Sequence, residues 1–255
     1  MRYLLFALSY YTRIPAPRLK EYRPDDATHA LRWFSFIGIV VGLVSALAWF
    51  VFARFLGFGQ QICAILALAV GVLATGAFHE DGFADMADGF GGGYTREKIL
   101  SIMKDSRIGS YGVIGLIFLF AAKFVLLSEV LREQSLASML FIIAYHAAAR
   151  ATAGCMVFCS SYARNDGTAK VAMDNRAWNW KEVALLLLFG LLPLAACAVI
   201  FTPLLMGAIV PLAILLAWFR HYCHKHIGGY TGDCLGALEQ LAEVVTLLWF
   251  SFILH

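Results

Sequence analysis

Mostly apolar stretches alternate with short polar connections along the whole chain. Seven such stretches cover roughly residues 34–53, 61–78, 111–130, 136–158, 182–202, 205–219 and 236–253. Apolar runs of about 18 or more residues are typical of membrane-spanning helices, because the hydrocarbon core of a bilayer requires that length. The pattern predicts an all-α, polytopic membrane protein with about seven transmembrane helices. The short connection TPLL (202–205) predicts that the fifth and sixth helices form a tight hairpin.

The remaining segments are short. The opening sequence MRYLLFALSYYTRIPAP (1–17) is apolar but contains no small-residue cleavage site. We therefore expect an interfacial, amphipathic helix there rather than a signal peptide. There is no internal repeat, and no connection is long enough for a soluble domain. Residues 1–255 are predicted to form a single transmembrane domain.

The composition agrees with a membrane protein and narrows the partners. Hydrophobic residues make up 61% of the 255 residues and charged residues 15%, against roughly 45–50% and about 25% in soluble domains. No basic run and no basic stripe interleaved with aromatic residues points to nucleic acid, so the expected surroundings are the lipid bilayer. The six cysteines lie mostly inside apolar stretches, and we expect no disulfide framework.

Lysine and arginine are distributed unevenly between the connections, which predicts an orientation. Sixteen of them fall in the N-terminal segment and the alternate connections that share its side, whereas the other side has only Arg54 and Arg132. Because basic residues are retained in the cytoplasm, the N-terminus is predicted to be cytoplasmic and the C-terminus external. The predicted location is the cytoplasmic (inner) membrane. The polar connections 79–93, 162–170 and 224–237 would then share the cytoplasmic face.

The segment HEDGFADMADGFGGG (79–93) places four acids directly after an apolar stretch. Asp81, Asp85 and Asp88 are spaced i, i+4 and i+7, which puts them within about 60° of one another on a helix. Three ionised carboxylates on one stripe repel one another, and at a membrane edge they require compensation. Hard divalent cations such as Mg²⁺ take oxygen ligands and would supply it. The alternative is a solvated helix end.

Glycines follow the same acids. They occupy positions 82, 89, 91, 92 and 93. They fit a close approach of the backbone to a bulky ligand and a break after the helix. An ordinary flexible loop would show the same composition.

A second polar segment, REKILSIMKDSRIGSYG (96–112), precedes the third apolar stretch. Asp105 is a candidate metal ligand or general base. Lys104 and Arg107 are candidates to neutralise phosphate oxygens, Arg107 through a bidentate fork. For the two cations, contact with anionic lipid head groups is the alternative.

Two further segments have two interpretations each. HAAAR (146–150) places Arg150 one helical turn after His146 inside the fourth apolar stretch, where a charge is costly unless it faces protein or a water-filled cavity. Arg150 is therefore either functional or paired with an acid that locks two helices. In GGYTGDCLGA (228–237), Thr231 and Asp233 either cap the last helix or bind the ligand.

Four segments resemble the signature segments of the cobalamin synthase family, the adenosylcobinamide-GDP ribazoletransferases. They are TRIPAP (12–17), HEDGFADMADGFGGG (79–93), IMKDSRIGSYG (102–112) and GGYTGDCLGA (228–237). The resemblance runs nearly end to end, with matching length and hydropathy. The paired acidic and KDSRIGSYG segments are its specific part.

The resemblance implies a Mg²⁺-dependent transferase of the last steps of cobalamin biosynthesis. The hydroxyl of α-ribazole, or of its 5′-phosphate, would attack the cobinamide-side phosphorus of adenosylcobinamide-GDP, and GMP would leave. The implied metal ligands are Glu80, Asp81, Asp85, Asp88 and Asp105. The implied phosphate contacts are Lys104, Arg107, Arg150 and Arg164. Asp88 and Asp105 are the candidates for the catalytic proton acceptor, and a homo-oligomer or an association with other cobalamin-assembly enzymes stays open.

Other functions fit the sequence less well. DMADG (85–89) has the Asp-x-x-Asp-Gly core of CDP-alcohol phosphotransferases of phospholipid synthesis, but FGGG replaces that family's continuation and Asp105 lacks a second Asp four residues later. A cation transporter is disfavoured because we expect almost no carboxylate inside the spans. Zinc at the Cys and His residues of 221–234 fits no closed Cys/His pattern.

Overall fold

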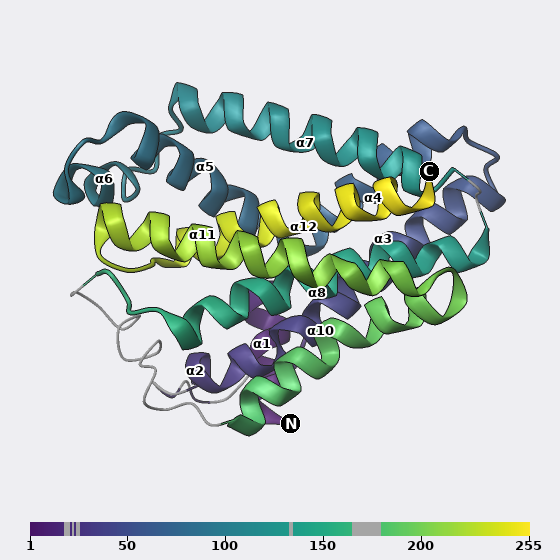
Figure 1. Ribbon diagram of the computed structural model, residues 1–255, viewed down its shortest axis with the longest axis horizontal. Helices are drawn as coiled ribbons and strands as arrows, with labels where there is room; N and C mark the ends of the chain where they lie inside the picture. Colours follow the sequence, from purple (N-terminus) through teal and green to yellow (C-terminus); the bar gives the residue numbers. More distant parts are fainter. Residues whose placement is uncertain (18–20, 22, 24–25, 133–134, 165–179) are drawn as a thin grey trace.

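The computed structural model is a bundle of long helices (Figure 1), which confirms the predicted all-α class. It describes residues 1–255 except 18–20, 22, 24–25, 133–134 and 165–179. In this described part, six helical segments are long and apolar enough to cross a membrane. They are Asp26–Arg54, Ser110–Val130, Leu136–Cys159, Trp180–Ile200, Pro203–Ile227 and Gly232–Leu254. A bent helix pair can form a seventh span, in agreement with the predicted number.

The helices follow one another with short connections. The α-helices are α1 (Arg2–Tyr11), α2 (Asp26–Ala30), α3 (Phe34–Arg54), α4 (Gln60–Thr75), α5 (Phe78–Gly92), α6 (Arg96–Ile102), α7 (Ser110–Val130), α8 (Met139–Cys159), α10 (Trp180–Ile200), α11 (Ile209–Ile227) and α12 (Gly232–Leu254). Short 3-10 helices, Leu31–Trp33, Leu136–Ser138 and Pro203–Ala208, lead into α3, α8 and α11. The predicted short connection between the fifth and sixth spans is confirmed, since α10 and the helix at Pro203 are separated by two residues.

Helix α8 lies in the centre of the bundle, packed on α3, α10 and α12. Small residues allow this packing. A Cβ atom at Gly38 of α3 would lie 2.6 Å from the carbonyl oxygen of His146, and one at Gly42 would lie 2.7 Å from the Cα of Ile143. Glycines four residues apart therefore bring the α3 backbone directly onto α8, as is common between membrane helices.

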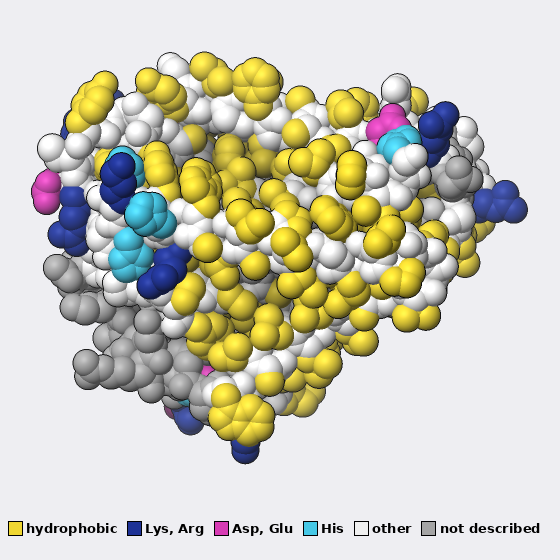
Figure 2. All heavy atoms as spheres, in the orientation of Figure 1, with side chains coloured by type: hydrophobic (Ala, Val, Ile, Leu, Met, Phe, Trp, Pro, Cys, Tyr) yellow, Lys and Arg dark blue, Asp and Glu magenta, His cyan; other side chains and the backbone are white. Residues whose placement is uncertain are grey.

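The face of the molecule drawn in Figure 2 has an apolar middle, with charged side chains gathered toward its two ends. Side chains such as Phe118, Val199 and Phe252 are 72–87% exposed. A water-soluble protein rarely exposes so continuous an apolar surface, whereas a bilayer covers it. The predicted polytopic membrane protein is supported by this distribution.

Three polar connections meet at the end of the bundle opposite the C-terminus (Figure 1). Arg96 of α6 joins them, because its guanidinium donates to the carbonyl oxygen of Ile227 at 2.9 Å and to that of Ala163 at 2.7 Å. The Ala163 N–H in turn donates to the carbonyl oxygen of Tyr230 at 2.8 Å. Of the segments predicted to share one membrane face, 79–93, 162–164 and 224–237 thus meet at one end of the molecule, and 165–170 lie outside the described residues. That this end is cytoplasmic stays a prediction.

The predicted span 61–78 is wrong at its end. Helix α4 ends at Thr75, and α5 leaves it at 90°. The bend is made by two consecutive residues in the left-handed region, Gly76 (φ 69°) and Ala77 (φ 59°). The N-terminal segment covers the bend, since the N–H of Arg13 donates to the carbonyl oxygen of Ala74 at 2.7 Å. TRIPAP is therefore a docking segment for the bend.

The last two spans are longer than hydropathy predicts. Helix α11 continues past residue 219 to Ile227, and α12 begins at Gly232 rather than at 236. Polar residues lower the hydropathy there but do not interrupt helical hydrogen bonds, and α11 ends only where Gly228 adopts φ 76°. The six cysteines are all free, so no disulfide links these helices.

Candidate active site

Helix α5 lies across the first turns of α12, and glycines make the contact close. A Cβ atom at Gly82 would lie 3.0 Å from the Cα of Asp233, and one at Gly236 would lie 3.0 Å from the carbonyl oxygen of His79. Each helix therefore presents a glycine to the backbone of the other. This contact sets the distance between the acids of α5 and the start of α12.

The four acids of α5 are not equivalent. Glu80 and Asp88 are buried, with exposed fractions of 7% and 8%, whereas Asp85 is half-buried and Asp81 is exposed. The predicted stripe is present in the helix, but its members face different surroundings. The two buried acids are bound by other helices.

Asp88 holds the beginning of α7. One carboxylate oxygen accepts the N–H of Gly109 at 2.7 Å, and the other accepts the N–H of Gly112 at 2.9 Å. These donors belong to the first turn of α7, where backbone N–H groups lack helical partners and favour a negative charge. A Cβ atom at either glycine would lie 2.5 Å from the carboxylate. The glycines of RIGSYG therefore permit this contact.

Glu80 faces α12. Its Oε1 accepts a hydrogen bond from the side-chain amide of Gln240 at 3.2 Å. Glu80 precedes Asp81 by one residue, so the two side chains leave the helix about 100° apart. The inward position of Glu80 accordingly leaves Asp81 on the open side.

Asp81 and Asp85 form the open part of the site. Neither carboxylate has a hydrogen bond or ion pair with any residue that the structure describes. Asp233 of α12 is within electrostatic reach of Asp85, and among the described residues it is paired with Arg164 at 2.9 Å. Carboxylates thus gather here with less positive charge than they require, which is the donor set that a hard divalent cation prefers.

The segment that leads into α12 provides the N-cap residue of this helix. The side chain of Thr231 accepts the N–H of Cys234 at 3.3 Å, which confirms the capping interpretation for this residue. Asp233 instead uses its carboxylate on Arg164 and on the hydroxyl of Thr231. Asp233 was not among the predicted metal ligands. Nothing in the sequence around Asp233 indicates that α5 packs against this residue.

Three glycines of the acidic segment (79–93) pack against side chains of neighbouring elements. Gly89 lies against Met103, Gly91 lies against the ring of Tyr111, and a Cβ atom at Gly93 would lie 2.7 Å from the side chain of Ile99. The helix also continues through Gly92, so the expected break comes only after that residue. These three glycines seat α6 and α7 on α5, and their close approach to a ligand stays a prediction.

Asp105 lies on the connection between α6 and α7 and is paired locally. Its carboxylate accepts the backbone N–H of Arg107 at 3.1 Å and the guanidinium of the same residue at 2.7 Å. This neighbour lowers the pKa of Asp105 to about 2. The side chain of Arg107 is 87% exposed. Asp105 is therefore ionised at neutral pH and bound to a surface cation.

Two of the predicted phosphate contacts share a cavity. Lys104 of the α6–α7 connection and Arg164 line a space of about 430 Å³, whose other charged lining residues are Arg96 and the single acid Glu97. Because Arg164 also binds Asp233, the cavity adjoins the acidic side of α5. The arrangement places positive charge beside the open carboxylates, as a phosphorylated ligand would require.

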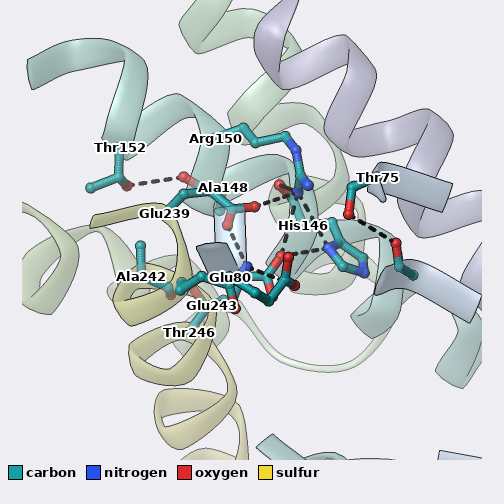
Figure 3. Close-up of polar contacts among 12 residues, drawn as sticks. Thr75, Glu80, His146, Ala148, Arg150, Thr152, Glu239, Ala242, Glu243 and Thr246 are labelled. Atoms are coloured by element: carbon teal, nitrogen blue, oxygen red, sulfur yellow. Dashed lines mark hydrogen bonds and ion pairs between the residues drawn. The ribbon is translucent and has the colours of Figure 1, made fainter. Parts of the chain in front are cut away.

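A second polar cluster lies inside the bundle (Figure 3). Arg150 of α8 is 1% exposed, and its Nη1 lies 2.7 Å from Glu239, 3.4 Å from Glu243 and 3.3 Å from Nδ1 of His146. His146 and Glu243 lie 2.5 Å apart. The structure favours the second interpretation of Arg150, an ion pair that locks helices.

Lys123 of α7 completes this cluster. Its ammonium group lies 2.5 Å from Glu243 and 2.6 Å from the side-chain oxygen of Gln240. The expectation that the spans contain almost no carboxylate is therefore wrong for α12. Glu239 and Glu243 lie i, i+4 on one face of an apolar helix, a spacing that could have indicated a buried ion-pair site.

The interior cluster has the ligands of a metal site but already contains a cation. Within the described residues, His146, Glu239 and Glu243 are the only three acids, histidines or cysteines whose ligand atoms lie within 4.8 Å of one another. Nη1 of Arg150 lies within 3.4 Å of one ligand atom of each. The guanidinium therefore takes the place that an ion would need.

The structure brings together only part of the predicted site. Asp81 and Asp85 are open, Glu80 and Asp88 are held by neighbouring helices, and Asp105 is paired with a surface arginine. The roles of all five as metal ligands stay predictions. A phosphate contact from Arg150 would require its buried contacts with Glu239, Glu243 and His146 to break.

Comparison with known proteins identifies the family. Residues 3–251 match the family described as cobalamin-5-phosphate synthase. Curated relatives named adenosylcobinamide-GDP ribazoletransferase include that of Shewanella amazonensis, 39% identical over 96% of this chain and 92% of the relative. Those of Shewanella baltica and Shewanella piezotolerans are 40% and 37% identical, over 94% and 96% of this chain and 90% and 92% of the relatives. No solved structure matches this chain. Since the match covers nearly every residue, including the acidic segment 79–93 and the polar segment 96–112, the chain belongs to the cobalamin-5-phosphate synthase family.

Proposed function

We propose that this protein joins α-ribazole, or α-ribazole 5′-phosphate, to adenosylcobinamide-GDP with release of GMP, in a Mg²⁺-dependent reaction. The observation that carries the proposal is the end-to-end family match to relatives named for this transfer. The open carboxylates of α5 beside a cationic cavity provide the chemistry. The product would be adenosylcobalamin or its 5′-phosphate.

The residues proposed to hold Mg²⁺ are Asp81 and Asp85. Their oxygens have no partner among the described residues, and Asp233 lies close enough to add to the negative field. When bound, Mg²⁺ would neutralise pyrophosphate oxygens and stabilise the charge of the leaving GMP. The side chains of the protein then need only to position two reactants in line, because phosphoryl transfer requires little covalent chemistry from the enzyme.

The cationic cavity is proposed to bind phosphate oxygens. Lys104 and Arg164 are its predicted contacts, and Arg96 adds a third cation that sequence reasoning missed. Arg107 is exposed at the rim of the same connection and is proposed to contact phosphate more peripherally. An arginine fork suits the paired oxygens of a phosphate, and a lysine supplies a compact charge.

The transfer exchanges one phosphorus–oxygen bond for another. A ribazole hydroxyl oxygen forms a bond to the cobinamide-side phosphorus, the bond from that phosphorus to the bridging oxygen breaks, and GMP leaves with the bridging oxygen. The hydroxyl proton passes to a carboxylate, for which Asp88 and Asp105 are the proposed acceptors. Asp88 and Asp105 flank the connection between α5 and α7, where the hydroxyl is proposed to enter.

The proposed location is the cytoplasmic membrane with the site facing the cytoplasm. The polar connections that surround α5 lie at one end of the bundle, and basic residues concentrate in those connections. Both substrates are largely polar, so they would reach this end from water. The apolar middle of the bundle would remain in lipid.

The test is turnover by the purified protein in detergent or nanodiscs. We expect GMP and a cobalamin product in equal amounts from adenosylcobinamide-GDP and either form of α-ribazole. Excess EDTA should stop the reaction, and added Mg²⁺ should restore it. Exchange of a CDP-alcohol without turnover of adenosylcobinamide-GDP would instead identify a phospholipid-type phosphotransferase.

A further inference from the structure

Helix α5 is fixed to the bundle by two of its own acids. Near its start, Glu80 accepts from Gln240 of α12, and near its end Asp88 accepts from the first turn of α7. The two acids between them, Asp81 and Asp85, have no described partner. Glu80 and Asp88, together with the glycine contact between Gly82 and α12, thus set the rotation of α5 about its axis. That rotation decides where Asp81 and Asp85 point.

The Glu80 contact is one end of a continuous chain of polar contacts. Gln240 donates to Glu80 at 3.2 Å and to Glu239 at 2.8 Å, and its oxygen accepts from Lys123 at 2.6 Å. Lys123 is paired with Glu243, which also lies beside Arg150. The chain therefore runs from α5 through α12 and α7 to the central helix α8.

The amide of Gln240 can have only one orientation in this chain. Its NH₂ group faces two carboxylates, and its oxygen faces an ammonium group. A flipped amide would place oxygen against carboxylate and NH₂ against ammonium, so both contacts would become repulsive. Gln240 is also 1% exposed, and no solvent is available to replace a lost partner. The interior charges therefore hold the amide in one position, and the amide in turn holds the carboxylate of Glu80.

We propose that Glu80 and Gln240 are positioning residues, through which the buried ion pairs of α7, α8 and α12 fix the rotation of α5 and hold Asp81 and Asp85 toward the start of α12. The inference rests on the proposed function in one respect, that Asp81 and Asp85 bind the divalent cation. It changes the predicted role of Glu80. Glu80 acts on the cation site through the helix and not as a ligand.

The decisive comparison is Glu80→Gln against Asp81→Asn. Both replace a carboxylate by the amide of the same shape, at neighbouring positions. The Glu80→Gln side chain keeps an oxygen that accepts from Gln240, so we expect turnover within about fivefold of the wild type and an unchanged Mg²⁺ requirement. The Asp81→Asn change removes a ligand charge, and we expect turnover to fall by at least about a hundredfold.

Metal binding without substrates gives a readout that does not depend on turnover. Mn²⁺ titration of the purified protein, followed by electron paramagnetic resonance, should show the same dissociation constant for wild type and Glu80→Gln. Asp81→Asn should bind Mn²⁺ at least about tenfold more weakly. If Glu80→Gln weakens Mn²⁺ as much as Asp81→Asn does, Glu80 is a ligand and the proposal is wrong.

A double-mutant cycle tests the connection to the interior. Glu80→Ala and Gln240→Ala should each weaken Mn²⁺ about three- to tenfold, and the double variant should be no weaker than the worse single variant, because both remove the same link. Thr246→Val on α12 is the control: it removes a buried hydroxyl that bonds only the carbonyl oxygen of Ala242 in its own helix. It should leave Mn²⁺ binding unchanged. Additive effects of the two alanine substitutions would overturn the link.

Failure of the proposed function would look different. A wild-type protein that binds Mn²⁺ but does not turn over adenosylcobinamide-GDP would remove the proposed substrates and leave the positioning roles intact. Wild-type turnover together with equal losses in Glu80→Gln and Asp81→Asn would leave the function intact and remove the positioning roles.

Discussion

Two groups of acids in this protein differ in what neutralises them. Glu239 and Glu243 lie in the interior within ion-pair distance of Arg150 or Lys123. Asp81 and Asp85 lie on the open side of α5, where no described residue forms an ion pair with them. Buried charges persist only when they are paired, so the interior group is complete as built. The open group has no such partner among the described residues, which is why it is the better candidate for the proposed Mg²⁺ site.

The largest effect should come from the open group. Asp85→Asn should lower turnover by about a thousandfold or more, equivalent to about 4 kcal/mol of transition-state stabilisation. The thermal unfolding temperature in detergent should remain that of the wild type, because no described contact is lost. Glu129→Gln at the opposite end is the matched control and should be fully active. A variant with normal turnover would show that the open group does not serve catalysis.

The interior group should respond in stability first. Arg150→Met leaves two buried carboxylates without their shared cation and should destabilise the protein by about 3–5 kcal/mol. The measurement is thermal unfolding in detergent, or the yield of folded protein where the variant does not accumulate. Arg150→Met combined with Glu239→Gln should recover part of the loss, since one carboxylate charge is removed with its partner. A fully stable single variant would contradict the pairing.

A smaller effect is expected where α5 meets α7. A Cβ atom at Gly112 would lie 2.5 Å from the Asp88 carboxylate and 3.0 Å from the carbonyl oxygen of Ala84, so Gly112→Ala must push α7 away. We expect a loss of about 1–3 kcal/mol in unfolding free energy. Gly59→Ala, where a Cβ atom meets nothing within 4 Å, is the control. Equal unfolding free energies of Gly112→Ala and Gly59→Ala would show that α5 and α7 are not in close contact.

The smallest effect concerns the bend that presents α5. Ala77 adopts φ 59°, which costs an L-residue about 1 kcal/mol relative to glycine. After the entropy that glycine adds to the unfolded chain, Ala77→Gly should stabilise by about 0.5 kcal/mol. Ala77→Val should destabilise by more than about 1 kcal/mol, because a branched side chain tolerates this region poorly. A higher unfolding temperature for Ala77→Val than for Ala77→Gly would mean that Ala77 does not adopt a positive φ at the bend.

Much of the fold was readable from hydropathy, because most spans are apolar over their whole length. The bend after Thr75 was not, since Ala77 carries no signal for the left-handed region and only the tertiary contacts of α5 impose it. The extension of α11 was missed for the opposite reason: its last turns are helical but polar. Hydropathy reports lipid exposure, and helical hydrogen bonding is a separate property.

The site was predictable in its acids but not in their partners. The i, i+4 spacing identified Asp81 and Asp85 as neighbours, and helical geometry alone suffices for that. The separation of Glu80 and Asp88 from them depends on Gln240, Gly109 and Gly112, which lie in other parts of the chain. Asp233 was missed as a neighbour of Asp85 because only the packing of two glycines brings it there.

Arg150 has a consequence for how the protein withstands metal depletion. The positive charge at the centre of the bundle is covalently attached to α8, so it cannot diffuse away, exchange with another ion or be extracted by a chelator. If turnover depends on Mg²⁺ as proposed, a cell short of divalent ions would keep the folded protein and lose only its turnover. Under that proposal, activity and structural integrity depend on two separate cations, one supplied by the chain and one taken from the surroundings.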